Sequence, residues 1–170
     1  DFTVLSFSPE LFFNKTGDNI VVKPMKGTIS RGTGPVADKK QSRMLFNSMK
    51  DRSENVMIVD LLRSDLGKIS RIGRVNVKKL FEIEKYKTLF QMTSTIASRI
   101  NRKIAFYDLF RAIFPSGSVT GAPKIRTMQI IRGLEKEPRG VYTGAVGFFT
   151  PQRNAMFNIA IRTAVIKGKK

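Results

Sequence analysis

The alternation of apolar and polar residues predicts a chain of short strands interrupted by several helices. Runs rich in β-branched and aromatic residues with a period of two are typical of half-buried strands. The predicted strands cover residues 2–8, 19–23, 74–77, 89–96, 141–149 and 155–165. Residues 14–19 have the composition of a turn, and residues 150–154 would join the last two strands into a long hairpin.

Helical patterns lie between these strands. Asp38 is a suitable cap for a helix that extends to about Lys50. Gly67 would close a second helix that starts near Ser53. A third helix is expected over residues 107–114, after the predicted central strands.

A fourth predicted helix begins at Pro123, a residue suited to the first turn. It carries apolar residues at intervals of three, namely Ile125, Met128, Ile131 and Leu134. The simplest interpretation is that this stripe faces the core. Together, the predicted strands and helices indicate an α+β fold class.

Composition excludes several classes of protein. The 170 residues are about one domain in length, and 41% hydrophobic residues with 13 Phe can fill a core. The absence of Cys excludes disulfides and Cys-type zinc sites, and the absence of His removes the commonest general base. A metal site would therefore use carboxylate oxygens, which favour Mg²⁺. No stretch has the pattern of a membrane span or signal peptide, so a cytoplasmic protein is expected.

The formal net charge of +18 raises the alternative of a nucleic-acid-binding module. Clustered Lys and Arg side chains would release counterions from a phosphate backbone. Here the cations are spread along the chain, and the acids gather mostly in residues 51–65 and 82–84. This distribution argues against a nucleic-acid interface, although a basic surface can still attract a small dianion.

Lys26 lies in an unusual local sequence. It follows an apolar run that ends at Pro24, and it precedes Gly27, which permits a turn and the close approach of a ligand. An amine held there could be partly desolvated, which would lower its pKa and make it a nucleophile. The alternative is a solvated lysine among the 31 Lys and Arg residues.

Acidic residues at two places are candidates for proton transfer or metal binding. Glu10 follows a strand end, where burial would raise its pKa and make it a proton donor; it could equally favour the start of a short helix. The apolar second helix carries Glu54, Asp60 and Asp65, and one of them is a plausible Mg²⁺ ligand. Asp60 lies between two apolar residues and risks burial, or it forms an ion pair with Arg63.

Two further segments could bind anions. The small-residue loop 116–122 precedes the fourth helix, so its hydroxyls and N–H groups fit an anion site. Such a loop is also an ordinary helix connection, and it lacks the lysine spacing of a nucleotide-binding loop. Arg162 lies late in a hydrophobic strand, where it suits bidentate carboxylate binding or points to water.

Six segments, in order, resemble the chorismate-utilising enzymes, a family that includes component I of aminodeoxychorismate synthase and of anthranilate synthase. The segments are Ser-Pro-Glu at 8–10, Pro-Met-Lys-Gly-Thr at 24–28, and residues 51–61, 114–124, 139–144 and 158–163. The resemblance spans nearly the whole chain and implies two facing antiparallel sheets with helices outside. It also implies that residues 1–170 are a single partial domain, truncated at both ends.

The resemblance implies catalytic roles for three residues. Glu54 would bind Mg²⁺, the metal that holds the ring carboxylate of chorismate. Glu10 would protonate the C4 hydroxyl as it leaves. Lys26 matches a nucleophile of the aminodeoxychorismate branch, which adds at C2 and is displaced when ammonia attacks C4. Anthranilate synthases usually have alanine at that position.

Substrate-binding roles are implied in the same way. Arg162 and Tyr142 match positions that hold a substrate carboxylate, and Gly27, Thr28 and Gly121 match its backbone cradle. The implied function is conversion of chorismate and ammonia to 4-amino-4-deoxychorismate with Mg²⁺, on the route to folate. A glutamine amidotransferase subunit would supply the ammonia. The alternative within the family is anthranilate synthase component I.

The chain departs from the family pattern at two points. The family commonly has His where this chain has Gln91, which donates hydrogen bonds but cannot shuttle a proton. The family's second metal carboxylate is expected beyond the segment that contains Arg162. This piece alone is therefore expected to bind Mg²⁺ weakly and to be inactive.

Overall fold

The structure is a computed structural model that describes residues 2–168, and it has the expected α+β fold with antiparallel sheets. Its strands are β1 (Phe2–Ser6), β2 (Leu11–Thr16), β3 (Asn19–Lys23), β4 (Met25–Ser30), β5 (Ser70–Lys85), β6 (Leu89–Ile100), β7 (Ala145–Phe149), β8 (Ala155–Ile159) and β9 (Thr163–Lys167). Within the described residues, a seven-stranded sheet has the order β4-β6-β3-β2-β8-β7, with β5 also paired to β6. β1 and β9 form a separate two-stranded ribbon.

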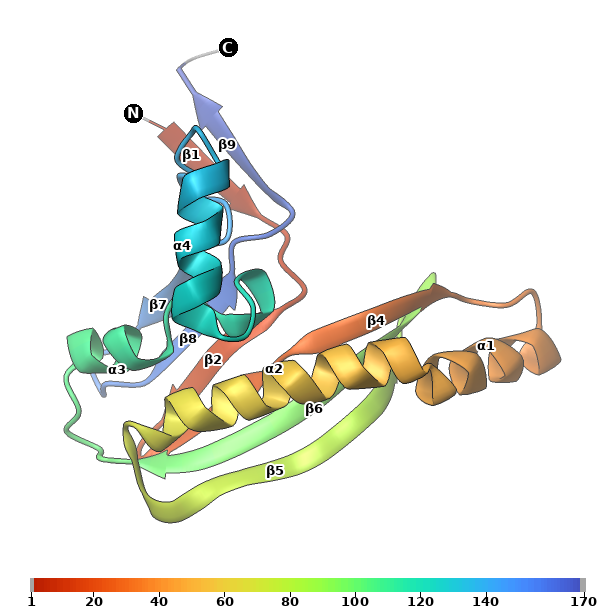
Figure 1. Cartoon of the computed structure of the whole chain (residues 1–170), viewed down its shortest axis with the longest axis horizontal. Helices are drawn as coiled ribbons and strands as arrows, with labels where there is room; N and C mark the ends of the chain where they lie inside the picture. Colours follow the sequence, from red (N-terminus) through yellow and green to blue (C-terminus); the bar gives the residue numbers. More distant parts are fainter. Residues whose placement is uncertain (1, 169–170) are drawn as a thin grey trace.

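The helices cover one part of the large sheet and one end of the molecule. They are α1 (Pro35–Asn47), α2 (Met49–Gly67), α3 (Phe106–Ile113) and α4 (Lys124–Leu134), with a short 3₁₀ turn, η1, at Gly117–Val119. Figure 1 shows α1 and α2 nearly end to end along β4, β5 and β6, whereas α4 and the β1–β9 ribbon both project away from these strands, in the upper part of the view. No helix in residues 2–168 is long and apolar enough to cross a membrane.

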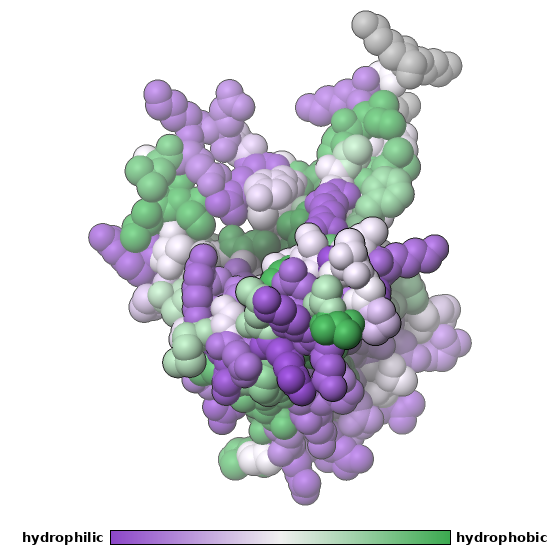
Figure 2. Space-filling view, turned by 90° about the vertical axis from the view of Figure 1, so that its right-hand side faces the viewer, coloured by the Kyte–Doolittle hydropathy of each residue, from purple (hydrophilic) through white to green (hydrophobic). Residues whose placement is uncertain are grey.

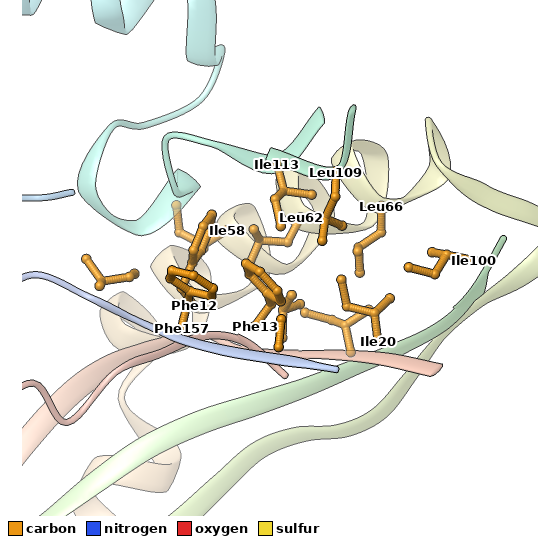
Figure 3. Packing of buried hydrophobic residues seen from close by; sticks show 14 of the residues in the cluster. Phe12, Phe13, Ile20, Ile58, Leu62, Leu66, Ile100, Leu109, Ile113 and Phe157 are labelled. Carbon is orange, nitrogen blue, oxygen red and sulfur yellow. The ribbon is translucent and has the colours of Figure 1, made fainter. Parts of the chain in front are cut away.

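The main core lies where α2 and α3 pack on the sheet. Figure 3 shows side chains from both helices meeting those of β2, β3, β6 and β8. Its labelled members are Phe12, Phe13, Ile20, Ile58, Leu62, Leu66, Ile100, Leu109, Ile113 and Phe157. In a smaller cluster, Leu45 of α1 packs with Phe81 of β5 and with Phe90 and Met92 of β6. The main core fixes α2 against β2, β3, β6 and β8, and α2 also contacts β4, the strand that carries Lys26, Gly27 and Thr28.

The strand predictions are correct only in part. β2 and β4 have no counterpart among the predicted strands, because these segments lack regular alternation. In β2, for example, the neighbouring Phe12 and Phe13 are both buried, and the pairing register shifts within the strand. The predicted strand over residues 155–165 is divided, because Arg162 adopts a φ of 48° and the chain leaves β8. The following strand, β9, pairs with β1 instead.

The expected cap at Asp38 is wrong, because α1 begins at Pro35 with Gly34 as its N-cap. The Asp38 carboxylate instead accepts hydrogen bonds from the Arg31 guanidinium and from the Gly32 N–H, the latter at 3.1 Å. This buried carboxylate therefore joins the first turn of α1 to the end of β4.

The second helix also begins earlier than predicted. It starts at Met49, after Ser48, whose hydroxyl accepts from the Asp51 N–H at 3.3 Å. It ends at Gly67, one residue beyond the predicted Leu66, and Lys68 instead of Gly67 is the C-cap.

The apolar stripe of the fourth helix does not face the core, so that interpretation is wrong. None of the residues of α4 is buried, and Ile125 and Leu134 are 75% and 77% exposed. Figure 2 shows hydrophobic groups on the surface in its upper part, where Figure 1 places α4 and the β1–β9 ribbon. Regular spacing identified the helix correctly, but the stripe has no covering element within the described residues.

Candidate active site

Lys26 lies in a β-bulge. β4 pairs with β6 through Met25 opposite Thr93 and Thr28 opposite Gln91, so two residues of β4 face one residue of β6. Gly27, the second residue of this bulge, has a φ of +90°, a conformation that side chains rarely adopt. Bulges turn a side chain away from the regular pleat. The sequence around Lys26 therefore gives its side chain an orientation that a regular strand would not.

The Lys26 side chain meets Glu10 and Ser118. Lys26 Nζ donates a hydrogen bond to the Ser118 carbonyl oxygen at 3.3 Å. Glu10 is only 5% exposed, and burial raises the pKa of its carboxyl group. The Ser118 side chain, the charge of Lys26 and the Met25 backbone each lower that pKa in part. A protonatable carboxyl group, an amine and a loop carbonyl thus lie together.

The loop that carries Ser118 is held on α2. A Cβ on Gly117 would lie 2.7 Å from Leu61 Cδ2, so glycine permits the close approach of loop and helix. At the far end of the loop, the Lys124 ammonium forms an ion pair with Asp65, which is 2% exposed. Lys124 also donates to the Ile113 carbonyl oxygen at 3.1 Å. α2 therefore anchors both ends of the loop.

Glu54 lies on the face of α2 that carries these contacts. Asp51, one turn earlier, packs against Gly27, where an added Cβ would lie 2.9 Å from the Asp51 Cβ. Leu61, two turns later, packs against Gly117. Residues separated by three, four or seven positions share a helix face, so Glu54 faces the bulge of β4 and the Ser118 loop.

The other two acids of α2 have different surroundings. Of the two alternatives for Asp60, the structure has the ion pair with Arg63, at 2.8 Å, and the Asp60 side chain is 61% exposed. Asp65 is the buried acid, and it pairs with Lys68 at 2.7 Å as well as with Lys124. Both of its oxygens are therefore engaged by lysines.

Glu54 offers the type of ligand that suits Mg²⁺, since a carboxylate is a hard oxygen donor. Within residues 2–168, however, no three side chains of Asp, Glu, His or Cys are grouped so that they could hold a metal. The donor chemistry of Glu54 fits the metal, but the described residues do not assemble a complete carboxylate set.

Tyr142 and Arg162 belong to two segments joined through Ala160. The Thr143 N–H donates to the Ala160 carbonyl at 2.9 Å, and the Ala160 N–H donates to the Gly144 carbonyl at 2.9 Å. Both Tyr142 and Arg162 are exposed. The backbone brings these segments together, whereas the two side chains are not joined to the Lys26 cluster by a direct hydrogen bond in the described structure.

A cavity of about 310 Å³ opens beside the loop that carries Ser118. Tyr142, Thr120 and Arg139 contribute to its wall, and the Arg139 guanidinium lies 5.9 Å from the centre of the Tyr142 ring. Gly121 follows Thr120 with a φ of +143°. The Glu10 carbonyl accepts from the Ile159 N–H at 3.1 Å at the end of β8, one residue before Ala160.

The sequence did not predict that Ser118 and Gln91 would contact the bulge that carries Lys26. Ser118 is only one of several small residues in its loop, and nothing in its spacing indicates that it meets Lys26. Gln91 is 7% exposed and bonds to the bulge through both amide atoms. The contacts of Gln91 had one signal in the sequence, because Gln91 is a polar residue within a predicted strand. A buried amide there requires hydrogen-bond partners.

The fold and the cluster around Lys26 define a site with the parts of an acid–base enzyme: an amine, a buried carboxyl group and a carboxylate on the adjoining helix. The chain belongs to the chorismate binding enzyme family, whose model matches residues 1–170.

Individual relatives come from two branches of this family. The chain is 51% identical over 164 residues to the aminodeoxychorismate synthase of Streptomyces pristinaespiralis, covering 96% of this chain and 23% of that protein. It is 42% identical over 166 residues to anthranilate synthase component 1 of Haloferax volcanii, covering 98% of this chain and 32% of that protein.

A solved structure has the same fold. Anthranilate synthase component I from Streptococcus pneumoniae TIGR4 superposes with a TM-score of 0.86 at 33% identity, over 97% of this chain and 36% of that one. The chain thus spans 23% to 36% of the length of these three proteins.

Proposed function

We propose that the protein containing this chain is an aminodeoxychorismate synthase component I, which converts chorismate and ammonia to 4-amino-4-deoxychorismate. The observation that carries the proposal is the proximity of Lys26 to the buried Glu10 through Ser118. An amine and a raised-pKa carboxyl group are the nucleophile and the proton donor that such a substitution needs. The 51% identity to an aminodeoxychorismate synthase supports the same branch.

In the proposed reaction, the unprotonated Lys26 amine forms a bond to C2 of chorismate. The ring double bonds shift, the bond from C4 to its hydroxyl breaks, and Glu10 donates the proton with which that hydroxyl leaves as water. Ammonia then forms a bond to C4, the double bonds shift back, and the C2–Nζ bond breaks. The new ammonium group loses a proton, which restores the protonated Glu10, and Lys26 leaves as the free amine.

Substrate binding in this proposal uses the residues around the cluster. Arg162 and Tyr142 would hold a carboxylate of chorismate, and the backbone of Gly27, Thr28 and Gly121 would surround the ring. The Thr28 hydroxyl is already engaged, because it donates to Gln91 at 2.7 Å. The net charge of +18 favours the approach of a dianion.

Glu54 is proposed as a Mg²⁺ ligand. When bound, Mg²⁺ would supply positive charge to a carboxylate of chorismate. We further propose that a glutamine amidotransferase subunit supplies the ammonia and that the product is used on the route to folate. The word "component" in the names of two relatives supports a partner subunit.

The second candidate is anthranilate synthase component I, which would release pyruvate and an aromatic amine. The 42% and 33% identities to anthranilate synthase components favour it. The two candidates differ in product and in the need for a lysine at position 26.

The test uses the full-length protein with chorismate, Mg²⁺ and ammonia, followed by identification of the product and intact-mass analysis. We expect 4-amino-4-deoxychorismate and an adduct on Lys26 that is absent in Lys26→Ala. Lys23→Ala is the matched control, because Lys23 lies on the preceding strand and pairs with Glu84. Fluorescent anthranilate as the product would favour the second candidate, and an unchanged rate in Lys26→Ala would refute the nucleophile.

A further inference from the structure

We infer that Gln91 is a positioning residue that sets the orientation of Lys26 by holding the bulge of β4. The inference rests on the proposed function, since it concerns the same lysine. Gln91 lies on β6, the strand that pairs with β4, and in the proposed reaction it touches neither the substrate nor the reacting atoms.

The bulge leaves part of β4 without regular ladder bonds. Between the pairs Met25–Thr93 and Thr28–Gln91, the two residues Lys26 and Gly27 face one residue of β6. An extra residue in a bulge is left unpaired and locally disrupts the ladder. Unless another group holds it, such a segment can shift and carry the Lys26 side chain with it.

Gln91 supplies the missing bonds from its side chain. Gln91 Nε2 donates to the Gly27 carbonyl oxygen at 2.8 Å, and Gln91 Oε1 accepts from the Thr28 hydroxyl at 2.7 Å. A carbonyl oxygen can only accept a hydrogen bond, so the Gly27 contact fixes which way the amide is turned. With 7% exposure, Gln91 makes these bonds largely out of water, where an unpaired group is costly.

The opposite side of the bulge rests on α2. Gly27 lies so close to the Asp51 side chain that an added Cβ would be 2.9 Å from Asp51 Cβ. The bulge is therefore held between the amide of Gln91 on the sheet and Asp51 on the helix. Lys26 directly precedes this held residue, and its amine reaches Ser118 O at 3.3 Å.

The expected effect on chemistry follows from geometry. A misplacement of about 1 Å can cost about 100-fold in rate when reacting atoms must meet at a fixed distance. Loss of the Gln91 bonds would free the bulge, so Lys26 would move together with Gly27 and Thr28, whose backbone belongs to the proposed chorismate cradle. We therefore expect kcat to fall and KM for chorismate to rise by a smaller factor.

The test compares two variants of the full-length protein with a control on the same strand. Gln91→Leu removes both hydrogen bonds. Gln91→Glu has nearly the same size and at pH 8 retains an acceptor for Thr28, but it has no proton for the Gly27 carbonyl. Ser98→Ala is the control, because Ser98 is also buried on β6 but bonds to Ser70, away from the bulge.

The first readout is the rate at which acetic anhydride labels Lys26, measured by peptide mass spectrometry with Lys68 as an internal reference. In both Gln91 variants we expect the Lys26 rate to rise about threefold or more, as the loss of a hydrogen bond allows. In Ser98→Ala it should not change. Unchanged Lys26 labelling in both Gln91 variants overturns the inference, whatever happens to activity or melting temperature.

The second readout is steady-state kinetics with chorismate and ammonia. We expect kcat to fall by about 10- to 100-fold in both Gln91 variants, with a smaller rise in KM for chorismate because Gly27 and Thr28 move with Lys26. A rise in KM alone would overturn the inference, because it would indicate a binding role for Gln91. If the wild-type protein forms no 4-amino-4-deoxychorismate, the proposed function fails, and the labelling rates still decide whether Gln91 positions Lys26.

Discussion

Replacing Gly27 by alanine tests whether the bulge beside Lys26 is as tightly enclosed as its geometry indicates. Gly27 has a φ of +90°, and an added Cβ would lie 2.9 Å from both Cβ and Cγ of Asp51. A left-handed conformation costs an L-residue about 1–2 kcal/mol, and overpacking costs about 1–3 kcal/mol. We therefore expect Gly27→Ala to lower the free energy of unfolding by roughly 2–5 kcal/mol.

Gly17→Ala provides the matched control. Gly17 has a φ of +62°, but an added Cβ would meet nothing within 4 Å, so only the conformational cost of about 1–2 kcal/mol applies. The difference between the two variants isolates the contact with Asp51. The free energies are measured by urea unfolding followed by circular dichroism.

A double variant separates the contact from other effects. Asp51→Gly removes the Cβ that the new methyl group would meet, so the cost of Gly27→Ala should be smaller in that background. Equal losses for Gly27→Ala and Gly17→Ala, or an unchanged loss in the Asp51→Gly background, would refute the close packing of α2 against the bulge.

Three further outcomes are expected. Asp65→Asn should destabilise the protein by about 3 kcal/mol in urea unfolding, because it leaves Lys124 without its buried partner; Asp60→Asn, an exposed control on the same helix, should change stability by less than about 0.5 kcal/mol. Burial raises the pKa of Glu10 above its ordinary value of 4.5. Between pH 4.5 and the raised pKa, the folded state therefore binds more protons than the unfolded state. The contribution of Glu10 to stability should fall as the pH rises through that range. Glu10→Gln should remove that decline in pH-dependent unfolding, and an identical pH profile in the variant would contradict it. Glu54→Gln should raise the Mg²⁺ concentration needed for half-maximal activity by about tenfold or more, whereas Asp60→Asn should not, and equal Mg²⁺ dependence in the two variants would argue against Glu54 as the ligand.

The sequence was most informative about elements with strong local signals. The hairpin around residues 150–154 follows from its turn composition and the flanking alternation, and the end of α2 lies within one residue of the predicted position. The family segments also direct attention to Lys26 and Glu10. Their proximity depends on a long-range contact with Ser118, which no local pattern encodes.

The burial of side chains on α4 and α2 could not be predicted in the same way, because it depends on which face of each helix another element covers. The stripe of α4 has helical spacing, yet spacing alone does not say whether another element packs on it. In α2, Asp60 lies between apolar neighbours in sequence, but the helical period buries Ile58, Leu62 and Asp65 and turns Asp60 outward. The bulge at Lys26 is set by the register of β4 on β6, a property of two strands far apart in the chain.

The way α2 meets the rest of the site limits how the length of this protein can vary. The helix touches Gly27 through Asp51 and Gly117 through Leu61, two points separated by ten residues and so by about 15 Å along its axis. One inserted residue between them would rotate the later contact by about 100° and shift it by about 1.5 Å, so the helix could no longer meet both glycines. Insertions and deletions among homologous chains should therefore fall in surface turns such as residues 150–154, while the interval from Asp51 to Leu61 keeps a constant length.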